Sequence, residues 1–260
     1  MWPKGKTAAL ILTFDFDAES AEYRKCPDKP VKLSKGIYGV KKGLPRILDL
    51  LDKHQLKATF FVCGWVAEKY PEITKEIVKR GHEVAAHGYL HENLSELSYQ
   101  EEEKVFNKMI TAIESICKTK PKGFRAPYWE FSKNTLNFLG KYEFLYDSSL
   151  MDDDVPYVIE LEGNKKIVEL PVEWVLDDWP LFEVHRKTPA QVYETWISEI
   201  DAAYEEGTLT VLTMHPQCIG RPSRIRLLDD LIVYAKRYKK LWIAKAIDVA
   251  KWSLSNNLKT

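Results

Sequence analysis

Short β-prone runs alternate with segments of helical periodicity along most of the chain, and this alternation constrains the fold more than any other sequence feature. The predicted strands are residues 8–16, 57–62, 83–86, 122–125, 144–147, 167–172, 208–214 and 241–243. Between them, apolar residues recur three and four positions apart, as at Leu44, Ile47, Leu48 and Leu51, which is the spacing of an amphipathic helix. This order predicts an α/β fold. About seven or eight strands alternating with helices favour a barrel over an open sheet, without deciding between them.

Helix-start signals place two of the longer helices. Ser98 and Glu101 form a capping box, so a helix should follow and run to about residue 117. Thr188 and Gln191 mark another helix start, with an expected end near residue 206.

Residues 18–42 lack such signals. They are charged and punctuated by glycine and proline, and we predict a long loop there. No internal repeat, low-complexity segment or linker divides the chain, so residues 1–260 are expected to form a single domain.

Charge and hydropathy exclude several classes of partner. Lysine plus arginine and aspartate plus glutamate both number 38, and a net charge of zero argues against a nucleic-acid binder. No apolar run approaches the roughly 18–20 residues of a membrane span, and the run at 8–12 is too short for a signal peptide. The four scattered cysteines favour reduced thiols. We therefore expect a cytoplasmic protein with no nucleic-acid or membrane partner; a homo-oligomer remains open.

Polar residues that are unusual for a buried position share one location, the carboxyl ends of predicted strands. They are Asp15 and Asp17 after the first strand, His87 after the third, Arg125 at the end of the fourth, Glu173 and Trp174 after residues 167–172, and His215 after residues 208–214. In β/α barrels this edge carries the active site. The convergence therefore predicts an enzyme.

Two carboxylates and two histidines form a candidate metal site. Asp15 and Asp17 should point to the same face of a strand, where they repel unless a positive charge lies nearby; a solvated loop or a helix cap is the alternative. His87 and His91 are four residues apart, so one tight loop can bring both to one ion. Two histidines and one aspartate leave a coordination position for water. Zinc is favoured, with cobalt, nickel, manganese and iron open.

Two further residues can act beside such an ion. His215 ends a very apolar strand, where an unpaired imidazole is costly, so a general acid or base is a reasonable explanation; a structural histidine is the alternative. Arg125 can hold a carboxylate ionised, or form a plain surface salt bridge. The aromatic residues near Asp177 and Asp178 suit a sugar-stacking groove and equally an ordinary loop anchored by tryptophan.

In order and spacing, these motifs resemble those of the polysaccharide deacetylase (NodB-homology, carbohydrate esterase) family. The matching segments are residues 13–17 (TFDFD) for TFDDG, 87–91 (HGYLH) for H-[ST]-x-x-H, 125–128 (RAPY) for RxPY, and 213–215 (TMH) for the last motif, a strand ending in His. Residues 126–132, 174–178 and 17–19 resemble the branch that holds a peptidoglycan deacetylase and allantoinase- or cyclic-imidase-like hydrolases.

The resemblance implies a distorted, seven-stranded β/α barrel of the NodB-homology type. It implies a divalent metal held by Asp17, His87 and His91. It also implies that Asp15 is the general base and that His215 is the general acid.

The same resemblance leads us to place Arg125 with the catalytic residues. Tyr128, Trp129, Trp174 and Asp178 are assigned to substrate binding. Two positions depart from the family pattern: Phe16 separates two aspartates that are usually adjacent, and Gly88 replaces the Ser or Thr that normally braces the histidine loop.

The predicted function is metal-dependent hydrolysis of a non-peptide C–N bond. A metal-bound water would attack the amide of an N-acetyl sugar, with the cation polarising the carbonyl. The first alternative is a hydrolase of a small cyclic imide or ureide, which the missing export signal favours. The second is a non-catalytic glycan-binding relative, which should lack at least one of the five site residues; all five are present.

Overall fold

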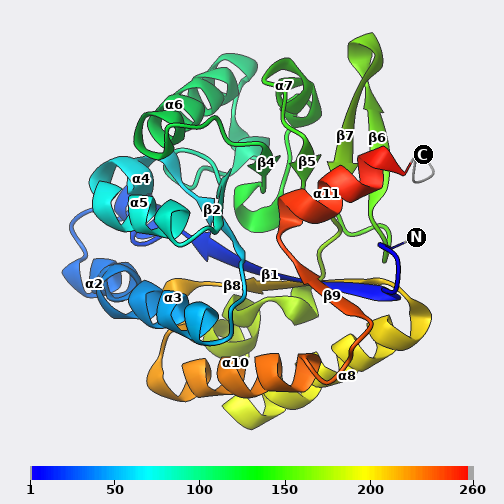
Figure 1. Ribbon diagram of the computed structural model, residues 1–260. Helices are drawn as coiled ribbons and strands as arrows, with labels where there is room; N and C mark the ends of the chain where they lie inside the picture. The colour runs from blue at the N-terminus through cyan, green and yellow to red at the C-terminus, as the bar shows by residue number, and fades with distance from the viewer. Residues whose placement is uncertain (1, 257–260) are drawn as a thin grey trace.

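The computed structural model describes residues 2–256, and its centre is a nine-stranded sheet with helices packed around it (Figure 1). The strands follow the order β6-β7-β5-β4-β3-β2-β1-β8, and β9 pairs with β1. Neighbouring strands are parallel except for the β6–β7 hairpin. The bounds are β1 Ala8–Phe16, β2 Thr59–Val62, β3 Glu83–Ala86, β4 Gly123–Phe124, β5 Tyr146–Asp147, β6 Tyr157–Leu161, β7 Lys165–Glu169, β8 Leu209–Met214 and β9 Leu241–Ala244. The α/β class predicted from the sequence is confirmed.

The expected seven-stranded barrel is only partly matched. Strands β6 and β9 lie outside the seven parallel strands of the main path. The sequence analysis did not predict β6, although its residues are β-prone and mostly partly buried. Within residues 2–256, one isolated bridge, between Asp177 and Thr213, links the chain that follows β7 to β8. The sheet therefore curls toward closure without completing a hydrogen-bonded ring.

Strand β1 is the centre of this sheet. All nine of its residues are buried, which explains its nearly continuous apolar sequence. Its first half pairs with β9 and its second half with β2, while β8 runs along its other edge. This position fixes the carboxyl end of β1, and therefore Asp15, in the middle of the sheet edge.

Alternation along the strands separates two apolar clusters. Leu10, Leu12 and Phe14 of β1 face the outer helices. Ala9 and Ile11 face the inner side, whose cluster also contains residues of α11 (Ala246–Ser255). Because side chains alternate, the inner face continues past Ile11 through positions 13, 15 and 17.

The remaining helices pack around this sheet (Figure 1). They are α1 Ser20–Lys25, α2 Pro30–Tyr38, α3 Leu44–Lys53, α4 Gly64–Lys69, α5 Pro71–Lys79, α6 Tyr99–Cys117, α7 Thr135–Lys141, α8 Pro189–Glu206, α9 Pro216–Ile219 and α10 Pro222–Ala235. The predicted capping box of α6 is present, and the predicted start of α8 also has one, formed by Thr188 and Gln191. The four cysteines are unpaired. Among the helices of residues 2–256, none combines the length and apolar character that a membrane span requires.

The prediction of a long loop over residues 18–42 is wrong. Helices α1 and α2 occupy most of it, and a π-helical turn, Gly39–Gly43, leads into α3. Pro30 lies in the first turn of α2, where its missing N–H costs nothing. Gly36 lies inside α2 because its backbone packs directly on Ala18; an added Cβ would be 2.2 Å from the Ala18 carbonyl oxygen. The proline and glycine therefore mark a helix start and a close contact.

Replacing Gly36 with alanine should lower the free energy of unfolding by about 1–3 kcal/mol, because the new methyl group meets rigid backbone. Urea unfolding followed by circular dichroism measures this. Gly140→Ala in α7 is the matched control, since its added Cβ meets side chains, those of Leu161 and Lys165, and no backbone, and it should be neutral or stabilising. Equal effects in the two variants would contradict the close packing of α2 on Ala18.

Candidate active site

The inner-face alternation brings polar side chains together at the carboxyl edge of the sheet. Asp15 and Asp17 continue the inner face of β1. His87 and His215 come directly after β3 and β8, at positions that alternation also places on the inner face. With His91 they line a cavity of about 650 Å³. The structure thus gathers the five residues that the sequence singles out as the reacting centre.

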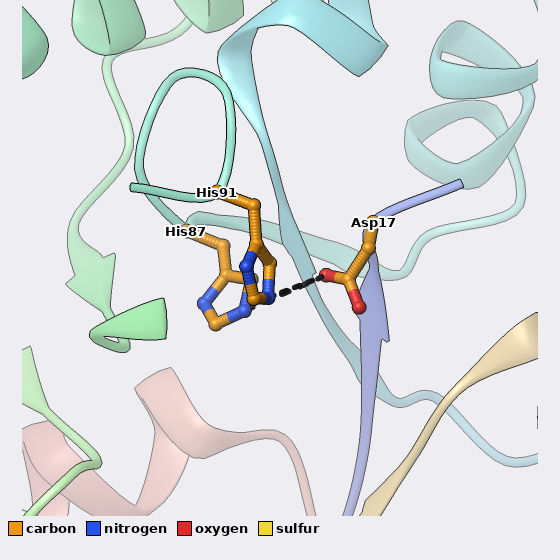
Figure 2. A group of neighbouring side chains, drawn as sticks. All are labelled: Asp17, His87 and His91. Atoms are coloured by element: carbon orange, nitrogen blue, oxygen red, sulfur yellow. Dashed lines mark ion pairs between the residues drawn. The ribbon is translucent and has the colours of Figure 1, made fainter. Parts of the chain in front are cut away.

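Asp17, His87 and His91 form a buried group whose ligand atoms all lie within 4.8 Å of one another (Figure 2). His87 Nε2 is 3.5 Å and His91 Nε2 is 3.8 Å from Asp17 Oδ1. His87 Nδ1 donates to the carbonyl oxygen of Arg125 at 2.8 Å, which leaves the lone pair of Nε2 facing Asp17. All three residues converge on one point.

The protonation states of this group suit a cation. Burial lowers the pKa of His87 to about 4 and that of His91 well below its ordinary value, so both imidazoles are neutral ligands at pH 7. Burial also raises the pKa of Asp17 well above its usual range, and Asp17 Oδ1 is buried without a hydrogen-bond partner. A divalent cation would satisfy that oxygen and favour the ionised carboxylate, so these residues fit a metal site.

Arg125 is completely buried and holds Asp15. Its Nη1 donates to Asp15 Oδ1 at 2.8 Å and to Thr13 Oγ1 at 2.8 Å. Nε and Nη2 donate to the backbone oxygen and the hydroxyl of Ser148. Although burial opposes ionisation of Asp15, the charge of Arg125 and its hydrogen bond to the carboxylate, with the charge of His215, outweigh burial and lower the pKa of Asp15. Asp15 is therefore ionised and lies beside Asp17, His87 and His91. It pairs with Arg125, as the sequence suggests.

His215 lies on the opposite side of Asp17, with its Nε2 3.7 Å from Asp17 Oδ2. Its Nδ1 is 2.7 Å from Asp178 Oδ1, and its backbone N–H donates to both Asp178 oxygens at 3.1 Å. Burial disfavours the imidazolium, but the charges of Asp177, Asp178 and Asp17 and the hydrogen bond to Asp178 raise the pKa of His215 well above its ordinary value. The raised pKa favours the protonated form of His215, whose Nε2 faces Asp17 while its Nδ1 faces Asp178.

The position of Asp178 corrects the assignment of this residue to substrate binding. Asp178 is completely buried behind His215 and lies outside the cavity lining, because both of its oxygens face the His215 backbone and ring. Asp177, its neighbour, does line the cavity. Asp178 is a positioning residue for His215.

Aromatic side chains form the walls beyond the histidines. Trp129 and Trp174 pack with ring centroids 4.4 Å apart, and Tyr128 meets His91 edge-on at 4.6 Å. All three line the cavity, and Trp174 and Tyr128 are exposed. Tyr128 and Trp129 have positive φ angles of 62° and 52°, a conformation that such bulky residues rarely adopt and that concentrates at functional sites.

Comparison with known proteins identifies the family. A sequence profile described as polysaccharide deacetylase matches residues 5–146. A peptidoglycan deacetylase of Helicobacter pylori is 32% identical over 250 residues, which cover 83% of this chain and 85% of that protein. The chain belongs to the polysaccharide deacetylase family.

Solved structures show the same fold. A putative polysaccharide deacetylase from Mycobacterium smegmatis has 38% sequence identity and a TM-score of 0.96, over 100% of this chain and 94% of that one. A structure of Puue allantoinase has a TM-score of 0.91 at 22% identity, over 99% and 94% of the two chains, and this similarity concerns the fold alone.

The two departures from the deacetylase family pattern have structural explanations. Phe16 points into the outer apolar cluster, so Asp15 and Asp17 still share the inner face. Gly88 has φ 68°, and an added Cβ would lie 3.0 Å from Pro127 Cγ. In this deacetylase-family chain Glu92 braces the histidine loop instead, by accepting from the N–H groups of Tyr89 and Leu90.

Sequence reasoning missed most of the cavity residues contributed by α1, α2, the turn that contains Val184, and α9. They are Ala21, Glu22, Lys25, Cys26, Lys32, Lys35, Val184 and Gln217. Most lie in or near residues that were expected to be loop, or outside any family motif. Only the Pro30 helix start signalled an ordered element there.

Replacing Asp178 with asparagine should lower the pKa of His215, because a negative charge and a charge-assisted hydrogen bond are lost. NMR titration of the histidine side chains measures this directly. If the protonated form of His215 is required for turnover, the loss of activity at high pH should also begin at a lower pH. Asp230→Asn is the control, since Asp230 is exposed and lies outside the cavity. An unchanged His215 titration in Asp178→Asn would contradict this pairing.

Proposed function

We propose that the protein hydrolyses the N-acetyl amide of an amino sugar in a glycan, using a divalent cation, preferentially zinc, held by Asp17, His87 and His91. One observation carries the proposal: a neutral two-histidine, one-aspartate group lies between a carboxylate paired with arginine and a protonated histidine. Membership of the polysaccharide deacetylase family supports amide hydrolysis of this kind.

Different side chains would carry out different steps of the hydrolysis. When bound, the cation supplies a Lewis acid that lowers the pKa of water and stabilises negative charge on the substrate oxygen. Asp15, kept ionised by Arg125, accepts the proton of the attacking water. His215 donates a proton from Nε2 to the departing nitrogen, which as an amide is otherwise a poor leaving group.

Positioning residues keep these protons in place. Asp178 accepts the Nδ1 hydrogen of His215, so the other ring nitrogen is directed to the cavity. Arg125 is fixed by Ser148 and Thr13 as well as by Asp15, and it therefore holds the carboxylate of Asp15 in a single orientation. Such fixed geometry removes the reorganisation that free groups would need.

The aromatic walls support a sugar substrate. Tyr128, Trp129 and Trp174 present flat apolar surface beside polar groups, which suits the faces and hydroxyls of pyranose rings. A small cyclic imide would fill only the part of the cavity near the histidines. The aromatic surface beyond Tyr128 favours the glycan substrate.

His91→Ala should release the metal and reduce turnover of an N-acetyl glycan at least about a hundredfold. Metal content by mass spectrometry and acetate release are the two measurements. His185→Ala is the control, because His185 is exposed and lies outside the cavity. Full activity of His91→Ala after exhaustive chelation would refute the metal role.

A substrate screen tests the bond that is cleaved. Chitin oligosaccharides and peptidoglycan fragments should release acetate, while succinimide, hydantoin and allantoin should remain intact. Chromatography of both substrate sets, with His215→Ala as the inactive control, gives the answer. Turnover confined to the cyclic compounds would replace the deacetylase proposal with the imidase one.

A further inference from the structure

Three lysines line the cavity, and the proposed hydrolysis uses none of them. Lys25 ends α1, and Lys32 and Lys35 lie on α2. These helices border the cavity because Gly36 allows α2 to pack on Ala18, next to Asp17. The contact between Gly36 and Ala18 therefore places these lysines in the wall of the cavity.

Two of the ammonium groups lie one aromatic ring away from the reacting centre. Lys25 Nζ is 4.7 Å from the ring centroid of Tyr128, whose edge packs on His91. Lys35 Nζ is 4.0 Å from the Trp179 ring, which lies 5.6 Å from the His215 ring. Positive charge therefore stands on both the metal side and the acid side of the cavity.

The availability of these charges differs. Lys35 pairs with Glu183 at 2.6 Å, so part of its charge is already neutralised. Lys25 and Lys32 are exposed, and in the part of the chain that the structure describes neither forms an ion pair or donates a hydrogen bond. Two lysines at the mouth are free to bind an anion.

The acidic residues of the cavity do not cancel this charge. Asp15 pairs with Arg125, and Asp177 Oδ1 lies 3.6 Å from His215 Nδ1. Asp17 belongs to the metal group. Glu22 is the acidic residue on the same wall as the lysines, so the mouth keeps a net positive charge.

We propose that Lys25 and Lys32, with Lys35, select a substrate that carries a negative charge close to the reacting acetamide: an anionic amino-sugar glycan bearing a carboxylate or a phosphate, in preference to a neutral one. This specificity rests on the proposed function. An ammonium group is a point charge that accepts either anion. In a cleft with apolar walls its field extends toward the bound sugar, and added salt screens it.

Calorimetric titration of the full chain tests binding separately from turnover. The ligands are chitotetraose, which is neutral, and a hyaluronan tetrasaccharide, which carries carboxylates. N-Acetylglucosamine 6-phosphate against N-acetylglucosamine tests the phosphate source. The wild-type protein should prefer at least one anionic ligand over its neutral partner, and the preference should fall as salt rises.

Lys25→Gln/Lys32→Gln should reduce the ratio of anionic to neutral affinity about fivefold, in the range expected for two partly screened charge pairs. Glu22→Gln should raise the same ratio, because it removes the negative charge that lines the cavity beside these lysines. Lys41→Gln is the matched control, being an exposed lysine outside the cavity. It should leave the ratio unchanged.

Two results would overturn the proposed selectivity: no preference for either anionic ligand in the wild-type protein, or an unaltered ratio in the double lysine variant. If anionic ligands bind preferentially through the lysines but no ligand releases acetate, the anion-binding role of the lysines stands. That result would contradict only the proposed hydrolysis.

Discussion

The buried guanidinium of Arg125 is the interaction on which the active edge of the sheet depends. It joins the end of β1, through Thr13 and Asp15, to the end of β5, through Ser148. The guanidinium also lies over the ring of Phe61, 4.1 Å from its centroid, and so contacts a third strand, β2. A completely buried charge is tolerated only when its partners are in place, and loss of one partner costs about 3–5 kcal/mol. The fold and the charge state of Asp15 are therefore fixed by the same group.

Charge pairing also explains why Asp17 differs from Asp15. Asp15 has the guanidinium of Arg125 at 2.8 Å. Asp17 has no arginine or lysine partner, its Oδ2 is 3.7 Å from His215 Nε2, its Oδ1 has no hydrogen bond, and burial raises its pKa. The two neutral histidines beside it can offer lone pairs but no charge. A divalent cation supplies what this arrangement lacks, which is the physical argument for a metal at this point.

Much of this edge could be predicted from the sequence because it follows from local rules. Strand alternation places Asp15 and Asp17 on one face, and the motifs at His87, His91 and His215 each follow a recognisable strand. The role of Asp178 could not be predicted, since adjacent aspartates carry no sign of which one turns inward. The course of α1 and α2 was equally inaccessible, because Gly36 is explained only by Ala18, a contact between segments that no periodicity relates.

The central place of β1 has a consequence for the biosynthesis of the molecule. Strand β1 is synthesised before two of its three partner strands, β8 (Leu209–Met214) and β9 (Leu241–Ala244). Until then, a nascent strand that is almost wholly apolar has an edge without its native neighbour. The sheet around β1 can be completed only after β8 and β9 have been translated, so until then the unpaired apolar strand favours association with other chains.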